Sequence, residues 1–420
     1  MERSKLYSII DERKDELFSL LSEIVKINSE NLTTHGNEKE CAQYIHDFSK
    51  KNGFESDMFS PMEIEDFDKH PDYLPGRNLE DRYNVVVRYP GAEDKDELML
   101  MAHTDTVRIG DVNNWEKDPL SGAICDGKIY GRGSCDDKYG VATALFVMKI
   151  LKENGFKPQK NLLFAGYCDE EYGGSHGAMA AVMKYPTEKI VNMDGREGQI
   201  WHCGSGGQEV KYFFHTKNTA DSAKAAAEAI PVIIDVIEKT FAQNRRNEME
   251  ENRFYKGTII PKTALRYMGA RSGNSGSDLG QCEVYFIFYT DKGKDEIYSE
   301  LNEVEKILAE RLKPLEIIGD GFKPATRFFH YVYCEPDSED IKLMIEASKE
   351  VTGKEPIVCG SCLSDLSVIS KYGSSRAFGF GNGRDFSTPG GAHQPNEYMG
   401  CEKLVEYAKI IATYILKVLG

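Results

Sequence analysis

The sequence lacks the features that mark membrane, nucleic-acid-binding and small secreted proteins. No apolar run approaches the roughly 20 residues that a membrane-spanning helix requires. Residues 1–14 predict a charged amphipathic helix without the apolar core of a signal peptide. Acidic residues outnumber basic ones, with 68 Asp and Glu against 52 Lys and Arg, and the formal net charge is −16. Such a chain repels nucleic acids and anionic membranes, so neither is predicted as a partner.

Repeats and long low-complexity segments are also missing from the 420 residues, and a hydrophobic content of 40% suffices for a large core. The ten cysteines are scattered, unlike the dense framework of a small disulfide-rich domain. This usage predicts a reducing, cytoplasmic setting. Cys359 and Cys362 form a single C-x-x-C. Because no second pair completes a zinc site, the sequence favours no special role for them.

The first half of the chain alternates between strand and helix patterns. Short apolar runs typical of buried strands lie at 84–88, 98–102, 161–167 and 190–193. Helical spacing of apolar residues occurs at 6–25, 38–52, 141–153 and 178–184. This alternation predicts an α/β sheet that helices cover on both faces.

The pattern changes at the Gly-Ser-Gly-Gly run of residues 204–207. The segments that follow predict a strand at 209–215, a helix at 220–242 interrupted by Pro231, strands at 264–268 and 282–290, and a helix at 294–312. This β-α-β-β-α order is typical of a ferredoxin-like α+β domain. The α/β pattern then resumes at 338–351, 376–380 and 401–419. We therefore expect a catalytic domain of residues 1–206 and 333–420, split around a smaller domain of residues 207–332.

Polar residues follow three of the predicted strands. His103 and Asp105 come after the strand at 98–102, Glu170 and Glu171 after 161–167, and Asp194 after 190–193. Ligands of open α/β sheets bind at the carboxyl ends of strands. Taken singly, a strand-end histidine is more often structural and an acidic turn is more often solvated. Consecutive carboxylates in an extended segment diverge, so one can bind a metal while its neighbour faces water and substrate.

Two glycine-rich loops add further candidates. Asp136 lies between the loop at 130–135 and a helix, where a carboxylate can bridge two cations or cap the helix N-terminus. His393 lies in the loop 390–397, and a lone loop histidine is more typical of a surface. The whole set joins imidazoles and carboxylates without a thiolate pair. That combination suits Zn, Co or Mn in an open catalytic site.

Five motifs, in chain order, carry a family resemblance. They are LMLMAHTDTV, YGRGSCDDKYGVA, AGYCDEEYGGSHGA, NMDG and GAHQPNE, and they extend from Leu98 to Glu397. The chain resembles the dinuclear zinc amidohydrolases that include aminoacylase, acetylornithine deacetylase, succinyl-diaminopimelate desuccinylase, carnosinase-like dipeptidases and tripeptidase. The resemblance implies a catalytic domain with a mixed sheet flanked by helices. It also implies an inserted ferredoxin-like lid that mediates dimerisation, so a homodimer is expected.

The resemblance implies a role for each candidate. His103, Asp136 and Asp194 would bind one divalent cation, most simply zinc. Asp136, Glu171 and His393 would bind the other, with Asp136 as the bridge.

Glu170 would be the general base that activates a metal-bound water and then protonates the leaving amine. Asp105 would orient His103, and the peptide bond between Asp136 and Asp137 would be cis. The reaction would be cleavage of an amide bond in a dipeptide, a short peptide or an N-acyl amino acid.

Two family features of the lid are missing. The family carries a histidine shortly before Asn-Ala-Ile on the long helix, at a position that falls near Thr219 in this chain. His215 lies four residues earlier and is either its replacement or an ordinary exposed strand residue. His202 and His330 are weaker candidates.

The second missing feature is an arginine that binds the substrate carboxylate, because Tyr289 stands near its place. Arg266 and Arg271 are nearby in sequence and are either replacements or surface charges. The departure leaves the choice between peptide and N-acyl substrates open.

Two other interpretations are weighed. The segment Gly173–Gly177 matches G-x-S-x-G, and a serine hydrolase would pair Ser175 with His393. The acidic segment between the strand and this turn argues against such a nucleophile elbow. A family member that has lost catalysis and acts as a binding protein is the other alternative. Retention of Glu170 argues against it, since a binder needs no base.

Overall fold

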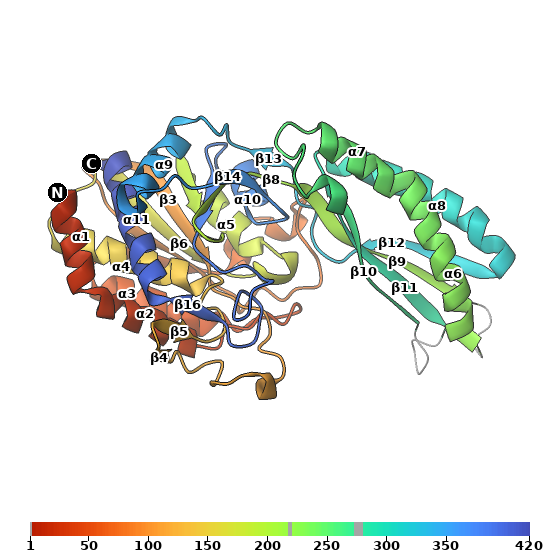
Figure 1. Cartoon of the computed structure of the whole chain (residues 1–420), viewed down its shortest axis with the longest axis horizontal. Coiled ribbons are helices and arrows are strands. Elements are labelled where there is room, and N and C mark those ends of the chain that lie inside the picture. The colour runs from red at the N-terminus through yellow and green to blue at the C-terminus, as the bar shows by residue number, and fades with distance from the viewer. Residues whose placement is uncertain (1, 217–220, 273–279) are drawn as a thin grey trace. The chain divides into compact units, whose positions relative to one another are not determined.

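The computed structural model describes residues 2–216, 221–272 and 280–420, which form two compact units (Figure 1). The first unit runs up to His202 and includes Tyr333–Cys359 and Val368–Gly420. The second contains Cys203–Val332 and Gly360–Ser367. Within the described ranges, no helix is long and apolar enough to cross a membrane.

A large mixed sheet forms the centre of the first unit, as the resemblance predicted. Its strand order is β1-β2-β6-β3-β7-β15-β8-β13, and β14 pairs with β8. In that order the strands are β1 (Glu55–Phe59), β2 (Asn84–Tyr89), β6 (Lys160–Tyr167), β3 (Glu93–His103), β7 (Lys189–Asn192), β15 (Phe378–Gly381), β8 (Gln199–Gly204) and β13 (Val332–Tyr333), with β14 (Val358–Ser361) beside β8. Strand β3 is parallel to β6 and β7, whereas β1, β2 and β6 pair antiparallel.

The register of the parallel strands brings their polar ends together. His103, the last residue of β3, pairs with Tyr167, the last residue of β6. Met101 of β3 pairs with Asn192 of β7, so two residues further on His103 reaches the level of Asp194. Side chains that follow these three strands therefore emerge at one edge of the sheet.

Helices cover both faces of this sheet because its strands are apolar on both sides. Leu98, Leu100 and Ala102 of β3 belong to the largest hydrophobic core, whereas Met99 and Met101 alternate with them. That core includes residues of α1 (Arg3–Glu12), α2 (Lys14–Lys26), α3 (Lys39–Lys51), α4 (Lys138–Glu153), α9 (Glu339–Thr352) and α11 (Cys401–Leu419). Helix α5 (His176–Lys184) contacts β2 and β6. The predicted single helix at 6–25 is two helices, because Arg13 has non-helical torsions.

A small sheet connects the two glycine-rich loops. It has the order β16-β5-β4, with β4 (Ile124–Cys125), β5 (Lys128–Tyr130) and β16 (Tyr398–Gly400). The loop that holds Asp136 follows β5, and the loop that holds His393 precedes β16. Pairing of Tyr398 with Tyr130 therefore places the two loops side by side.

The second unit has the expected ferredoxin-like architecture (Figure 1). Its antiparallel sheet has the order β10-β11-β9-β12. The strands are β9 (Gly206–Thr216), β10 (Leu265–Ser272), β11 (Gln281–Thr290) and β12 (Ile317–Pro324), and the packed helices are α6 (Ser222–Ile237) and α8 (Lys294–Leu312). A separate hydrophobic core joins these helices to the sheet.

Pro231 does not interrupt the long helix, contrary to the sequence prediction. Helix α6 continues through it and is followed by a π-helical turn, Glu238–Ala242, and by α7 (Gln243–Glu251). An internal proline costs a helix about 3 kcal/mol. The helix nevertheless buries Ala229, Ile233 and Val236 in the core of this unit, and this burial offsets the cost.

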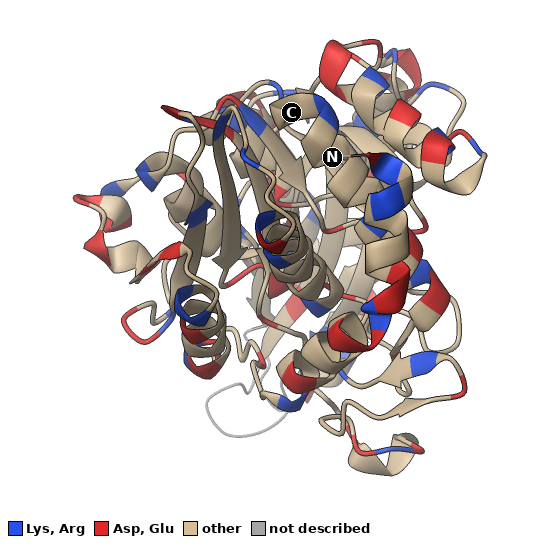
Figure 2. Cartoon of the chain, turned by 90° about the vertical axis from the view of Figure 1, so that its left-hand side faces the viewer, with Lys and Arg blue, Asp and Glu red and all other residues tan. Residues whose placement is uncertain are grey.

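Charged residues of both signs are interspersed on the helices of the face in Figure 2. Several form ion pairs, such as Lys149 with Glu16 and Lys417 with Glu346. Exposed pairs of this kind contribute little to stability individually. On this face the net negative charge is therefore not gathered into one acidic patch.

Candidate metal centre

Three predicted ligands converge at the sheet edge. His103 ends β3, Asp136 precedes α4, and Glu171 follows β6. Each offers one ligand atom, and these atoms all lie within 4.8 Å of one another. The Nε2 atom of His103 lies 3.1 Å from Oδ1 of Asp136. The arrangement can hold a metal ion.

His393 joins the same cluster from the opposite loop. Its Nε2 atom lies 3.2 Å from Oδ2 of Asp136 and 3.1 Å from Oε2 of Glu171. Each oxygen of Asp136 therefore faces a different imidazole. A carboxylate in this position can bridge two cations.

Asp194 follows β7, next to β3. The hydroxyl of Tyr139 donates to the carbonyls of Met193 and Gly195, at 2.7 and 3.2 Å, and so fixes the backbone on both sides of Asp194. Burial raises the pKa of Asp137 well above its usual range, and the charge of Asp194 raises it further. The peptide bond between Asp136 and Asp137 is cis, which confirms that prediction.

The electrostatics of the cluster favour positive charge. Burial lowers the pKa of His393, but Glu171 and Asp136 outweigh this effect and raise it to about 11. His103 behaves in the same way: burial lowers its pKa, and Asp136 and Glu170 raise it well above the usual value. Carboxylates that stabilise cationic imidazoles this strongly would also stabilise metal ions. The donor set of imidazole and carboxylate groups fits divalent ions such as zinc.

Asp105 contacts His103 through its backbone rather than through its carboxylate. The Nδ1 atom of His103 lies 2.9 Å from the Asp105 carbonyl, and the carboxylate is 3.8 Å away. A proton on Nδ1 leaves Nε2 free to bind a cation. The Asp105 carboxylate instead accepts the amides of Glu170 and Glu171, at 3.0 and 2.9 Å. The Asp105 carbonyl is thus the nearer group to His103, the carboxylate also serves the turn after β6, and the orienting role of Asp105 stays a prediction.

Glu170 is half-buried and begins the turn that contains Glu171. Its charge acts on His103, where it raises the imidazole pKa after burial has lowered it. The Glu171 carboxylate faces His393, whereas the Glu170 charge acts on His103.

Sequence analysis gave no role to two charged residues that connect the loops. Nη1 of Arg132 donates to Oε2 of Glu397 at 2.6 Å, and both side chains are buried. The other carboxylate oxygen accepts the Cys135 amide at 2.9 Å. Both residues lie within the recognised motifs, which is the signal that could have indicated them. Asn31, whose side-chain amide donates to the Asp105 carboxylate at 2.8 Å, was also missed, and nothing in its local sequence distinguishes it.

The lid candidates lie in the second unit. His215 of β9 lies 2.8 Å from Asp320 of β12. The position near Thr219 is outside the described residues. Arg266 donates to the Tyr289 hydroxyl at 3.0 Å. The roles of these residues stay predictions.

The remaining candidates have other contacts. Arg271 forms a 3.0 Å ion pair with Glu283. Nδ1 of His202 lies 3.1 Å from the Cys334 carbonyl, and the ring of His330 packs on that of Phe328.

Neither Ser175 nor the C-x-x-C pair gains support. Ser175 is buried at the start of α5, and its amide donates to the Asp169 carbonyl. His393, which the serine interpretation requires, faces two carboxylates instead. None of the ten cysteines, all of which lie within the described ranges, forms a disulfide, and this includes Cys359 and Cys362.

Comparisons with known proteins agree with this geometry. Residues 99–417 match Peptidase family M20/M25/M40. An uncharacterized metallohydrolase of Methanocaldococcus jannaschii is 26% identical over 432 residues, which covers 94% of this chain and 98% of that protein. A Beta-Ala-Xaa dipeptidase of Lactobacillus delbrueckii subsp. lactis is 30% identical over 206 residues, covering 45% of this chain and 38% of that protein.

The fold has a close counterpart among solved structures. Human carnosine dipeptidase 1 superposes with a TM-score of 0.73 at 16% identity, covering 100% of this chain and 99% of that chain. The family relationship predicted from the five motifs is thereby confirmed. The family match extends over most of the chain, from Met99 in β3 to Lys417 in α11, so the chain belongs to Peptidase family M20/M25/M40.

Proposed function

We propose that this hydrolase uses two divalent cations to cleave the amide bond of a dipeptide, a short peptide or an N-acyl amino acid. The observation that carries the proposal is the Asp136 carboxylate, whose two oxygens face different imidazoles at 3.1 and 3.2 Å. This arrangement would let the carboxylate share its two oxygens between two ions, each with an imidazole of its own.

The residues would divide into two ligand sets around Asp136. His103 and Asp194 would complete one set, and Glu171 and His393 the other. Zinc suits these donors best, and cobalt or manganese would also fit. When bound, the ions would polarise the scissile carbonyl and lower the pKa of the attacking water.

Glu170 would act on the water as the general base. Its backbone is fixed by the Asp105 carboxylate, while its own side chain belongs to neither ligand set. It would accept the proton of the water as the oxygen attacks the carbonyl. It would then deliver this proton to the amine that leaves.

Further parts of the proposal concern the second unit and the setting. Residues 207–332, inserted in sequence into a catalytic domain of residues 1–206 and 333–420, would act as a lid and as the contact surface of a homodimer. The separate core of this unit supports its folding as a domain. His215 would contact the oxyanion, and Arg266 with Tyr289 the substrate carboxylate. Ten cysteines without a disulfide, all within the described ranges, support a reducing, cytoplasmic setting. The name of the Lactobacillus relative supports a dipeptide as substrate.

The test is amine release from dipeptides, tripeptides and N-acyl amino acids by protein loaded with zinc, cobalt or manganese. We expect turnover in the wild type and a loss of roughly 10²–10⁴-fold in Glu170→Gln. The variant should keep its metal and its fold. Ser175→Ala is the matched control and should stay active. Full activity of Glu170→Gln, or loss in Ser175→Ala that chelators do not reproduce in the wild type, would contradict the proposal.

A further inference from the structure

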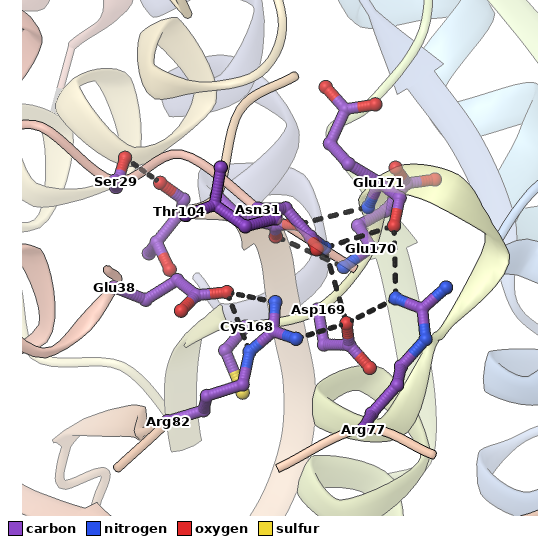
Figure 3. Close-up of polar contacts among 12 residues, drawn as sticks. Ser29, Asn31, Glu38, Arg77, Arg82, Thr104, Cys168, Asp169, Glu170 and Glu171 are labelled. Atoms are coloured by element: carbon purple, nitrogen blue, oxygen red, sulfur yellow. Dashed lines mark hydrogen bonds and ion pairs between the residues drawn. The ribbon is translucent and has the colours of Figure 1, made fainter. Parts of the chain in front are cut away.

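Beneath the turn that carries Glu170 and Glu171 lies a chain of buried charges (Figure 3). Arg77 and Arg82 flank the carboxylate of Asp169, each with a guanidinium nitrogen 2.6 Å from Oδ1. Arg82 also donates to Glu38, with Nε 2.9 Å from Oε1. These four side chains are between 0 and 6% exposed. Both arginines come from the segment before β2, far from the turn in sequence.

The Asp169 carboxylate has two further donors. Nδ1 of His176 lies 2.5 Å from Oδ2. Because Nε2 of His176 accepts the Leu74 amide, the proton that His176 shares with Asp169 is on Nδ1. Asn31 donates to Oδ1 at 3.2 Å. Four side chains from three parts of the chain thus converge on one carboxylate.

The same side chains hold the backbone that follows. Arg77 donates to the carbonyls of Glu171 and Tyr172, at 3.4 and 2.6 Å. Asn31 donates to the Glu171 carbonyl at 3.0 Å and to the Asp105 carboxylate at 2.8 Å. Asp105 in turn accepts the two amides of the turn. The amides of Glu170 and Glu171 and the Glu171 carbonyl therefore each have a buried side-chain partner.

The turn needs this support because its backbone is strained. Asp169 and Tyr172 both have a φ of 60°, a left-handed backbone conformation that residues other than glycine rarely adopt. Each such residue costs on the order of 1–3 kcal/mol and persists only where its surroundings determine it. Buried charges are themselves a poor way to gain stability, since apolar residues of similar volume often serve as well or better. Their presence here calls for a reason other than stability.

We infer that Arg77 and Arg82 are positioning residues. By fixing the Asp169 carboxylate and the carbonyls after it, they would set the directions in which Glu170 meets the water and Glu171 meets a cation. The inference rests on the function proposed above for these two glutamates. It assigns neither arginine a contact with the substrate.

The experiment compares Arg77→Ala with Arg376→Ala in the full-length, zinc-loaded chain. Arg376 is a matched control, because its guanidinium donates two hydrogen bonds, at 2.6 and 2.8 Å, to the buried Asp340 away from the turn. Arg77→Ala should lower kcat by about 10²-fold with little change in KM, since misplacement of about 1 Å costs that much. Added guanidinium ion should restore at least about a tenth of the lost rate. Arg376→Ala should keep its kcat and show no response to guanidinium.

An unchanged kcat in Arg77→Ala, or a lowered kcat that guanidinium does not raise, would overturn the inference. Arg82→Lys should give a similar loss of kcat. If that variant does not fold, the Arg77 comparison decides alone, because Arg77 lies at the edge of the network.

A second measurement separates this inference from the proposed function. Absorption spectra of the cobalt-loaded protein and competition with a chelator report on Glu171 without any turnover. Arg77→Ala should shift the cobalt bands and weaken zinc binding about tenfold or more, as loss of a group behind a ligand usually does. Arg376→Ala should change neither. If the wild type hydrolyses no amide but these shifts occur, the proposed function fails and the positioning role stands. Identical cobalt spectra and zinc affinities in the wild type and Arg77→Ala would contradict the positioning role.

Discussion

The candidate metal centre lies between two loops that the protein supports in different ways. The loop 390–397 delivers His393 and is joined to the loop that holds Asp136 mainly through Glu397, which accepts from Arg132 and from the amides of Cys135 and Gly131. Arg132 also donates to the His393 carbonyl at 3.4 Å. The turn 169–173 delivers Glu170 and Glu171. It is held by two arginines, an asparagine, a histidine and the carboxylate of Asp105.

The difference follows from what each loop has to place. A histidine ligand is drawn to its position by the cation that it binds, so its loop needs only approximate guidance. A general base binds no metal and receives no such guidance. The direction of Glu170, the proposed base, would have to come from the protein, through a turn in which the amides of Glu170 and Glu171 and the Glu171 carbonyl are bonded to buried side chains. Precise support is therefore concentrated where the cations cannot supply it.

The largest effect is expected from Asp136, which lies in neither loop but faces His393 of one and shares the candidate metal site with Glu171 of the other. Asp136→Ala should reduce the zinc content after loading and desalting from about two ions per chain to fewer than one. The variant should lose several kcal/mol of transition-state stabilisation, roughly 10³-fold in rate. Metal analysis together with circular dichroism checks this result. Two tightly bound ions in a folded Asp136→Ala protein would contradict the bridging role.

A smaller, asymmetric effect should distinguish the two loops. Glu397→Gln loosens the His393 loop and should weaken zinc binding by about 10–100-fold. Excess zinc should then restore kcat, because the ion itself draws His393 into place. Asp169→Asn disturbs the other side, and its loss of kcat should persist at saturating zinc. Zinc titrations of activity for both variants make the comparison. The contrast between the loops is wrong if zinc rescues both variants equally.

Candidate ligands could be predicted from the sequence because their side-chain chemistry is restricted, whereas residues that matter only through their place in the fold could not. His103, Asp136 and His393 were recognisable because few side chains bind zinc and because they occur in ordered motifs. Asn31 and Arg77 contact Asp169 across 138 and 92 residues, and many other buried donors could do the same work in a different fold. No local pattern encodes such a partner.

The fold shows the same division. Short apolar runs predicted β2, β3, β6 and β7 of the large sheet, and β9, β10 and β11 of the ferredoxin-like unit were also predicted, whereas β1, β8 and β12 were not. Local rules failed where tertiary contacts outweighed them. Pro231 was expected to interrupt a helix that the core holds together. The bonds of Asp105 to the turn after β6 were also not predicted, although its carboxylate lies 3.8 Å from His103 as well. In the folded sheet the end of β6 is closer to the Asp105 carboxylate, with amides at 2.9 and 3.0 Å.

The smallest effect on kcat should come from Glu38, at the outer end of the charge network. A change there should alter stability with little effect on catalysis. Burial raises the pKa of Glu38 to about 7, even though Arg82 opposes the shift. The folded protein then binds a proton that the unfolded chain releases near pH 4.5, so this group stabilises the fold at low pH. That contribution is lost as the pH rises toward 7, with a slope of at most about 1.4 kcal/mol per pH unit. Denaturant unfolding at pH 5, 6 and 7 should show this slope in the wild type and a reduced slope in Glu38→Gln. The kcat of this variant should stay within about threefold of the wild type, because Glu38 touches Arg82 but not the turn. A large loss of kcat would mean that the support of Glu170 extends to Glu38.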